Sequence, residues 1–96
     1  MKRQGLHITV SGSVQGVGYR YYCREEAARR GLTGFVMNMP DGNVELEVFG
    51  AADLIDDFIM DITRKDRSYI VREIKKYTIP DNESYSDFSI AQYPGY

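Results

Sequence analysis

The chain has 96 residues, of which 43% are hydrophobic and 27% are charged, and its formal net charge is -2. This composition excludes a disordered chain, and we expect residues 1–96 to form one domain. The charge balance offers no overall basic field for nucleic acid. The single cysteine excludes an intrachain disulfide and favours a reducing, cytoplasmic compartment, and no apolar run approaches the length that a membrane span needs.

The first predicted strand leads directly into a glycine-rich segment. Apolar residues alternate with polar ones near the start of the chain, at Leu6, Ile8 and Val10. This alternation predicts a strand with one buried face. Three glycines then fall within seven residues, at Gly12, Gly16 and Gly18. A helix-like segment follows, so the pattern is a strand, a glycine-rich loop and a helix start.

A loop of this kind can hold an anion. Glycines adopt the left-handed dihedrals that let several backbone N–H groups converge, and a helix N-terminus favours negative charge. Arg20 adds a planar charged fork, and its neighbours three and four positions on, Cys23 and Arg24, are not acidic. The segment can also be a simple turn beside a solvated arginine, because glycine-rich loops are weakly specific. The unpaired cation favours an anion that arrives from outside.

The middle of the chain predicts a helix followed by a hairpin. Residues Tyr21–Arg30 have helical spacing, and Gly31 indicates the helix end. Gly34–Asn38 is a short apolar run that predicts a strand. The turn residues Pro40–Gly42 separate it from Val44–Val48, where apolar and acidic residues alternate.

The second half of the chain predicts a helix and two more strands. One apolar stripe at helical spacing consists of Leu54, Ile55, Phe58, Ile59 and Ile62. The other side carries Asp53, Asp56, Asp57 and Asp61, which we interpret as a solvated face rather than a metal site. Tyr69–Ile79 has strand composition, and its alternation breaks near Glu73, which indicates a bulge. Phe88–Ile90 predicts a short strand at a sheet edge.

The order of these elements is β-α-β-β-α-β with one further strand. It predicts an α+β fold, the ferredoxin-like βαββαβ sandwich, in which two helices cover one face of an antiparallel sheet and a short C-terminal strand is added. A fold of this kind does not by itself specify a function.

Several chemistries have little support in the residues. His7 and Cys23 are the only histidine and cysteine and form no ligand cluster, so we expect no metal and no nucleophilic triad. The spacing from Cys23 to Arg29 matches that of cysteine phosphatases, but the residues between are helix formers that include Glu25 and Glu26. RNA recognition by a ferredoxin-like sheet needs stacking aromatics on the central strands, which this sequence lacks.

Asn38 is the second residue of interest, because it ends an apolar strand just before a turn. Asparagine at such a position commonly bonds to its own backbone. Its amide can instead orient a water molecule against a bound phosphoryl group. Spacing alone leaves both interpretations open.

Two multi-residue motifs resemble those of the acylphosphatase family. Gly12–Arg20, with the sequence Gly-Ser-Val-Gln-Gly-Val-Gly-Tyr-Arg, is similar to the first signature. Gly34–Asn38, continued by Pro40–Val44 and on to Gly50, is similar to the second. The motifs stand in the family's order and spacing, the similarity extends over essentially the whole chain, and the family has the ferredoxin-like fold.

The resemblance implies hydrolysis of the carboxyl–phosphate bond of acyl phosphates, without a metal or other cofactor. It implies that Arg20 binds the phosphoryl group, that Asn38 orients the water, and that a loop of backbone N–H groups holds the phosphate. The loop residues are Gln15, Gly16, Val17, Gly18, Tyr19 and Arg20. The expected partners are a small-molecule acyl phosphate and inorganic phosphate as product or inhibitor, with no nucleic acid and no membrane, and the expected state is a monomer.

The sequence departs from the family pattern at two places. Tyr19 stands where the family usually has phenylalanine, and its hydroxyl needs a partner or solvent. The family commonly has a Gly-Pro pair after the second helix, and this chain has Thr63–Ser68 instead. Two other function classes stay open beside the enzyme: a module that binds a phosphorylated or carboxylated ligand without turnover, and an RNA-binding domain, which the negative charge disfavours.

Overall fold

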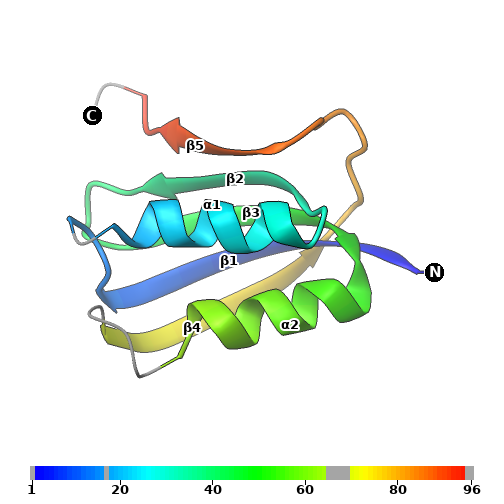
Figure 1. Ribbon diagram of the computed structural model, residues 1–96. Coiled ribbons are helices and arrows are strands. Elements are labelled where there is room, and N and C mark those ends of the chain that lie inside the picture. The colour runs from blue at the N-terminus through cyan, green and yellow to red at the C-terminus, as the bar shows by residue number, and fades with distance from the viewer. Residues whose placement is uncertain (1, 17, 65–69, 95–96) are drawn as a thin grey trace.

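The computed structural model describes residues 2–16, 18–64 and 70–94. The predicted order of elements is confirmed (Figure 1). The elements are β1 (Arg3–Ser13), α1 (Tyr19–Arg29), β2 (Thr33–Asn38), β3 (Val44–Ala51), α2 (Ala52–Ile62), β4 (Ile70–Ile79) and β5 (Phe88–Gln92). Val17, Tyr69 and most of the Thr63–Ser68 connection lie outside the described residues.

The strands form one sheet in the order β4-β1-β3-β2-β5. The first four strands in sequence pair antiparallel, as the sequence predicts, whereas β5 pairs parallel with β2. The complete sheet is therefore mixed rather than antiparallel. The reason is that β4 ends at the end of the sheet where β2 begins, so the chain crosses to the far edge there and starts β5 in the direction of β2 (Figure 1).

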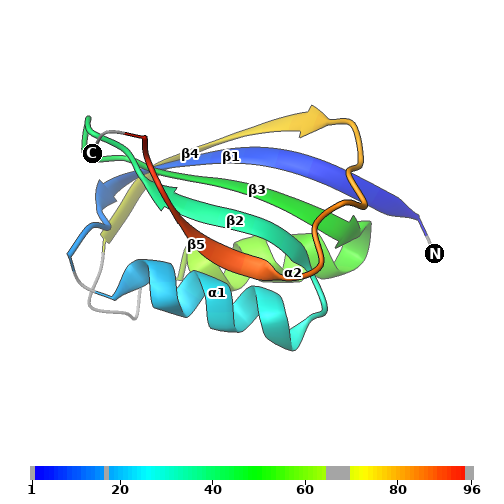
Figure 2. The ribbon, with the colours of Figure 1, turned by 90° about the horizontal axis from the view of Figure 1, so that it is seen from above.

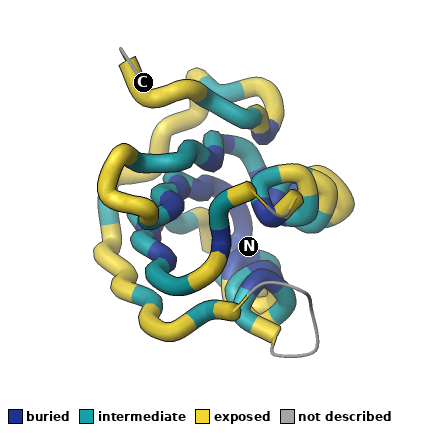
Figure 3. The backbone as a smooth tube through the Cα atoms, turned by 90° about the vertical axis from the view of Figure 1, so that its left-hand side faces the viewer, coloured by how far each residue is buried: buried dark blue, intermediate teal, exposed yellow. Residues whose placement is uncertain are grey.

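Both helices lie on one face of the sheet (Figure 2). Alternate residues of the central strands are buried beneath them: Leu6, Ile8 and Val10 of β1, and Val44, Leu46 and Val48 of β3. The helices bury Tyr19, Cys23 and Ala27 from α1, and Ile55, Phe58 and Ile62 from α2. Figure 3 shows these buried segments gathered inside the molecule, with the exposed residues on the outer turns. The residues predicted to be buried from the strand alternation and from the helical spacing thus form one core.

The bulge predicted near Glu73 is present in β4. The pairing of β1 with β4 shifts between Ser11 opposite Glu73 and Gly12 opposite Val71, which leaves Arg72 as the extra residue. Gly12 has φ 135°, and a Cβ atom there would lie 2.1 Å from the carbonyl oxygen of Ile70. The position therefore requires glycine, and it lies where β1 leads into the glycine-rich loop.

Helix α1 begins two residues earlier than predicted, at Tyr19 instead of Tyr21. Gly18 precedes it in the left-handed conformation, with φ 81°, and its carbonyl oxygen accepts the hydrogen bond of the Tyr22 N–H. The predicted end at Gly31 is confirmed: the Leu32 N–H donates to Ala27 and the Gly31 N–H donates to Ala28. As a result, Tyr19 and Arg20 both lie in the first turn of the helix.

The acidic side of α2 is solvated at Asp53, Asp56 and Asp57, as the sequence predicts. Asp61 is different, because it is half-buried and forms an ion pair with Arg30 just after α1. This pair links the two helices across the surface of the core. Over the described part of the chain, no helix is long and apolar enough to cross a membrane.

The hydroxyl of Tyr19 has a buried partner. Tyr19 is 1% exposed, and its hydroxyl donates a 2.8 Å hydrogen bond to the carbonyl oxygen of Ile62 at the end of α2. We expect Tyr19→Phe to lower the free energy of unfolding by about 1–2 kcal/mol, because it leaves a buried acceptor without this donor. Urea unfolding measures the change. Tyr22→Phe is the matched control, since the Tyr22 hydroxyl donates to Asp61 at 3.1 Å in a half-buried position; an equal loss in both variants would contradict a special role for the buried bond.

Candidate active site

The ends of β2 and β5 bring together two polar side chains that are far apart in the sequence. Asn38 ends β2 and is paired in register with Gln92, which ends β5. Side chains two residues apart on a strand share a face. Asn38 therefore lies on the same face as the buried Val36, and Gln92 lies on the same face as the buried Phe88. Both project from the helix-covered face, at the end where the first turn of α1 lies.

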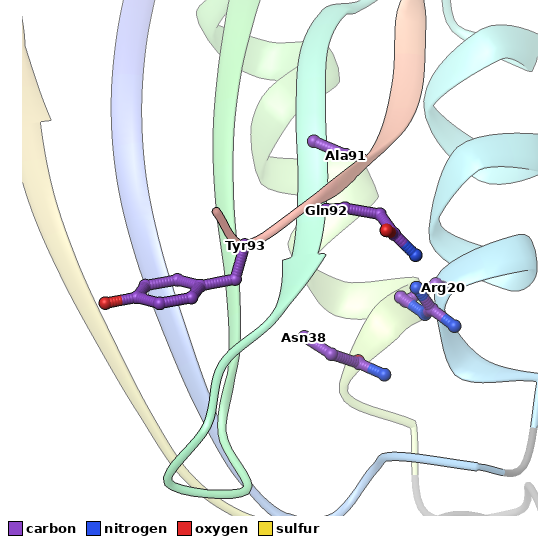
Figure 4. A pocket seen from close by; sticks show the side chains of 5 residues that line it. All are labelled: Arg20, Asn38, Ala91, Gln92 and Tyr93. Atoms are coloured by element: carbon purple, nitrogen blue, oxygen red, sulfur yellow. The ribbon is translucent and has the colours of Figure 1, made fainter. Parts of the chain in front are cut away.

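Arg20 completes this group from the helix side. A hollow of about 170 Å³ is lined by Arg20, Asn38, Ala91, Gln92 and Tyr93. Figure 4 shows the side chain of Gln92 directed toward that of Arg20, with Asn38 below both, while the ring of Tyr93 points away. Two of the three polar groups in this hollow, Arg20 and Asn38, are those that the sequence predicts.

No described neighbour neutralises the charge of Arg20. Its side chain has no hydrogen bond or ion pair with any described residue, and the first turn of α1 contains no acidic residue. Arg24, one turn further on, differs in that it lies 3.6 Å from the carboxylate of Glu25 and 4.9 Å from the ring centroid of Tyr21. An unpaired guanidinium beside a helix N-terminus is a strong site for an anion.

The predicted phosphate loop faces a second hollow that shares Arg20 with the first. Its volume is about 200 Å³, and its lining is Val14, Gly16, Gly18, Tyr19, Arg20 and Tyr21. Gly16 and Gly18 have φ 75° and 81°, and apart from their chain neighbours no described residue has an atom within 4 Å of a Cβ built on either. No side chain in the described part of the chain caps the N-terminus of α1, so its first N–H groups lack that partner. Gly16 and Gly18 therefore have the positive φ values that backbone anion sites commonly use.

The side chain of Gln15 bonds to a neighbouring turn. Its Nε2 donates two hydrogen bonds of 2.8 Å, to the carbonyl oxygens of Met39 and Asn43. These oxygens belong to the turn that follows Asn38, so Gln15 joins the start of the loop to the strand end that carries Asn38. These bonds use the side chain of Gln15, whereas the predicted phosphate contact uses its backbone N–H, which stays a prediction.

Asn38 has a buried acceptor that no described group satisfies. Its Oδ1 is fully buried and has no hydrogen-bond partner among the described residues. The expectation that a turn asparagine bonds to its own backbone is therefore not met at this oxygen. A buried acceptor left unpaired destabilises the fold by about 1–3 kcal/mol.

Cys23 and His7, which the sequence does not favour as a nucleophile or a metal ligand, lie outside both hollows. Cys23 is fully buried inside α1, and burial raises the pKa of its thiol to about 12, so it is not a nucleophile near neutral pH. His7 is half-buried on β1, with Nε2 3.0 Å from Glu45 and Nδ1 3.1 Å from Glu47. Among the described residues, no cluster of three histidine, cysteine, aspartate or glutamate side chains could hold a metal ion.

Gln92 was missed in the sequence. The alternation that marks Phe88 and Ile90 as core residues continues to Gln92 and would have placed it on the inner face. That signal gives the face but not the neighbour. The neighbour depends on the parallel pairing of β5 with β2, which the sequence did not predict.

Comparison with known proteins agrees with this geometry. A model of the Acylphosphatase family matches residues 6–90. An acylphosphatase from Alcanivorax borkumensis is 57% identical over 53 residues, which are 55% of this chain and 58% of that protein. One from Chlorobaculum tepidum is 39% identical over 90 residues, which are 94% of this chain and 98% of that protein. The crystal structure of acylphosphatase from Bacillus subtilis superimposes with a TM-score of 0.86 at 33% identity, covering 92% of this chain and 98% of that one.

Proposed function

Since the chain belongs to the acylphosphatase family, enzymes that hydrolyse acyl phosphates, we propose that it does so without a metal ion. Arg20 and the backbone N–H groups of residues 15–20 hold the phosphoryl group, and Asn38 orients the attacking water. The resemblance found in the two sequence motifs is thus confirmed at the level of family, and the residue roles are the proposal.

One observation carries these roles. Arg20, whose guanidinium has no hydrogen bond or ion pair with a described residue, and Asn38, whose buried Oδ1 has no described partner, line the same hollow. The guanidinium can bind an anion, and Oδ1 can only accept a hydrogen bond. A phosphoryl group beside a water molecule satisfies both, because the phosphoryl oxygens accept from Arg20 and the water donates to Oδ1 once the Asn38 amide turns this atom toward the hollow.

The chemistry needs few protein groups. An acyl phosphate is a mixed anhydride with a good carboxylate leaving group, so positioning and charge stabilisation suffice. Water bonded to Asn38 Oδ1 directs a lone pair at phosphorus. As the new P–O bond forms, the bond to the acyl oxygen breaks and its electron pair leaves with the carboxylate. Arg20 and the loop N–H groups stabilise the charge on the phosphoryl oxygens.

The proton of the water passes to a phosphoryl oxygen. Neither hollow is lined by a described aspartate, glutamate or histidine that could act as a general base. The products are a carboxylate and inorganic phosphate, and phosphate competes with substrate for the same loop. As the family resemblance implies, we propose a monomeric enzyme that acts in the cytoplasm on a small molecule.

Hydrolysis of benzoyl phosphate with EDTA present tests the proposal. We expect turnover that the chelator does not reduce, competitive inhibition by inorganic phosphate, and, in water enriched in heavy oxygen, label in phosphate rather than in benzoate. No turnover by the folded protein would contradict the enzyme assignment. Turnover that EDTA removes and added Mg²⁺ restores would contradict a metal-free mechanism.

A further inference from the structure

Gln92 is the third polar group at the hollow, and neither the phosphoryl contact nor the water contact uses it. Its side chain extends from the end of β5 toward Arg20 (Figure 4). The residue is exposed, and its amide has no hydrogen bond to any described residue. The amide carries both donors and an acceptor, so it is available to a ligand in the hollow.

The position of Gln92 relative to Asn38 fits a reaction with an entering and a leaving oxygen. The two residues stand opposite each other on paired strands, which lie about 4.8 Å apart. An in-line displacement has the attacking and the leaving oxygen on opposite sides of phosphorus. Two polar side chains on adjacent strands, facing the same guanidinium, can therefore contact one side each.

We propose that Gln92 is a substrate-contacting residue whose Nε2–H donates a hydrogen bond to the carbonyl oxygen of the acyl group. This inference rests on the proposed function. When the bond between phosphorus and the acyl oxygen breaks, the electron pair spreads over both oxygens of the new carboxylate. A donor on the carbonyl oxygen thus stabilises the leaving group more than the bound substrate, which is the condition for accelerating the chemical step.

In this assignment, different residues of the hollow contact the phosphoryl group and the acyl group. Arg20 and the loop contact phosphoryl oxygens, so they bind inorganic phosphate as well as substrate. Gln92 contacts only the acyl part, so its removal leaves phosphate binding unchanged. This difference separates Gln92 from a second phosphate ligand and from a residue that only supports the position of Arg20.

The test uses two phosphonates that are not hydrolysed. Phenacylphosphonate keeps the acyl carbonyl and replaces the bridging oxygen with CH₂, whereas phenethylphosphonate lacks the carbonyl. Both inhibition constants, and that of inorganic phosphate, are measured for the wild type and for Gln92→Met, which keeps the length of the side chain and removes the donor. Gln4→Met makes the same change on β1, outside both hollows, as the control.

We expect Gln92→Met to weaken phenacylphosphonate about tenfold, as for one lost hydrogen bond to a ligand, and to lower kcat/KM for benzoyl phosphate at least as much. The constants for phenethylphosphonate and phosphate stay within about twofold, and Gln4→Met changes nothing. An equal loss for all three ligands, or none, would overturn the inference.

Failure of the proposed function has a different signature. If the wild type does not hydrolyse benzoyl phosphate yet prefers phenacylphosphonate in a Gln92-dependent manner by calorimetry, the contact stands and the enzyme assignment fails. If the wild type hydrolyses benzoyl phosphate and the preference for the carbonyl survives Gln92→Met, the enzyme assignment stands and the inference is wrong.

Discussion

Replacing Arg20 with alanine is expected to lower kcat/KM for an acyl phosphate by about two to four orders of magnitude, because the charged group that opposes the transition-state charge is removed. The same variant is expected to lose most inhibition by inorganic phosphate, since we propose that phosphate binds to the same guanidinium. The fold is expected to persist, because Arg20 has no hydrogen bond or ion pair with a described residue whose loss would destabilise it.

The measurement is the hydrolysis of benzoyl phosphate with and without phosphate, together with the midpoint of urea unfolding. Arg24→Ala is the matched control: it removes the same charge one helical turn away, outside the Arg20–Gln92 hollow. Arg20→Lys keeps the charge but not the planar fork, and should lie between the wild type and Arg20→Ala. Equal losses in Arg20→Ala and Arg24→Ala would indicate a general field effect rather than a contact.

Much of the fold could be predicted because its residues follow strict periods. The alternation at Leu6, Ile8 and Val10 and the helical stripe around Phe58 each place one face in the core, and burial confirms both. The break near Glu73 identified the bulge, because a side-chain period of two cannot continue through an extra residue. These signals are local, so a single sequence carries them.

The features that the sequence missed depend on contacts between distant residues. The parallel pairing of β5 follows from where β4 ends, which no local pattern records. The ion pair of Arg30 with Asp61 joins two helices, and the acidic pattern of α2 alone could not separate Asp61 from its solvated neighbours. The start of α1 was placed too late because Gly18 marks a turn equally well when the helix begins directly after it.

The candidate site also contains residues that local motifs predict and residues that only the fold brings in. Arg20 and Asn38 could be chosen from the sequence because they sit in local motifs with known residue types. Gln92 enters the site only through the register of two strands, and the Gln15 side chain reaches the turn after Asn38 only in the folded chain. Local motifs thus point to the residues that we propose for phosphate and water, and tertiary structure points to the residue that we propose for the acyl part.

Replacing Asn38 with alanine is expected to reduce turnover by about two to three orders of magnitude while inhibition by inorganic phosphate stays nearly unchanged. The reason is that the proposed mechanism has Oδ1 contact the water and not the phosphoryl group, so the variant no longer directs the water at phosphorus. KM and the inhibition constant of phosphate should stay nearly unchanged because the loop is intact, and kcat should fall because the water is no longer oriented.

Stability provides an independent reading of the same variant. If Asn38 were a structural residue, its removal would lower the free energy of unfolding. Its buried Oδ1 instead lacks a described partner, so Asn38→Ala removes an unsatisfied acceptor and should leave the urea midpoint unchanged or raise it. Asn43→Ala, in the adjacent turn, serves as the control and should retain turnover. If Asn38→Ala loses activity but keeps phosphate inhibition and stability, Asn38 acts in the reaction and not in the fold. If stability and phosphate binding are lost together with activity, Asn38 is a structural turn residue.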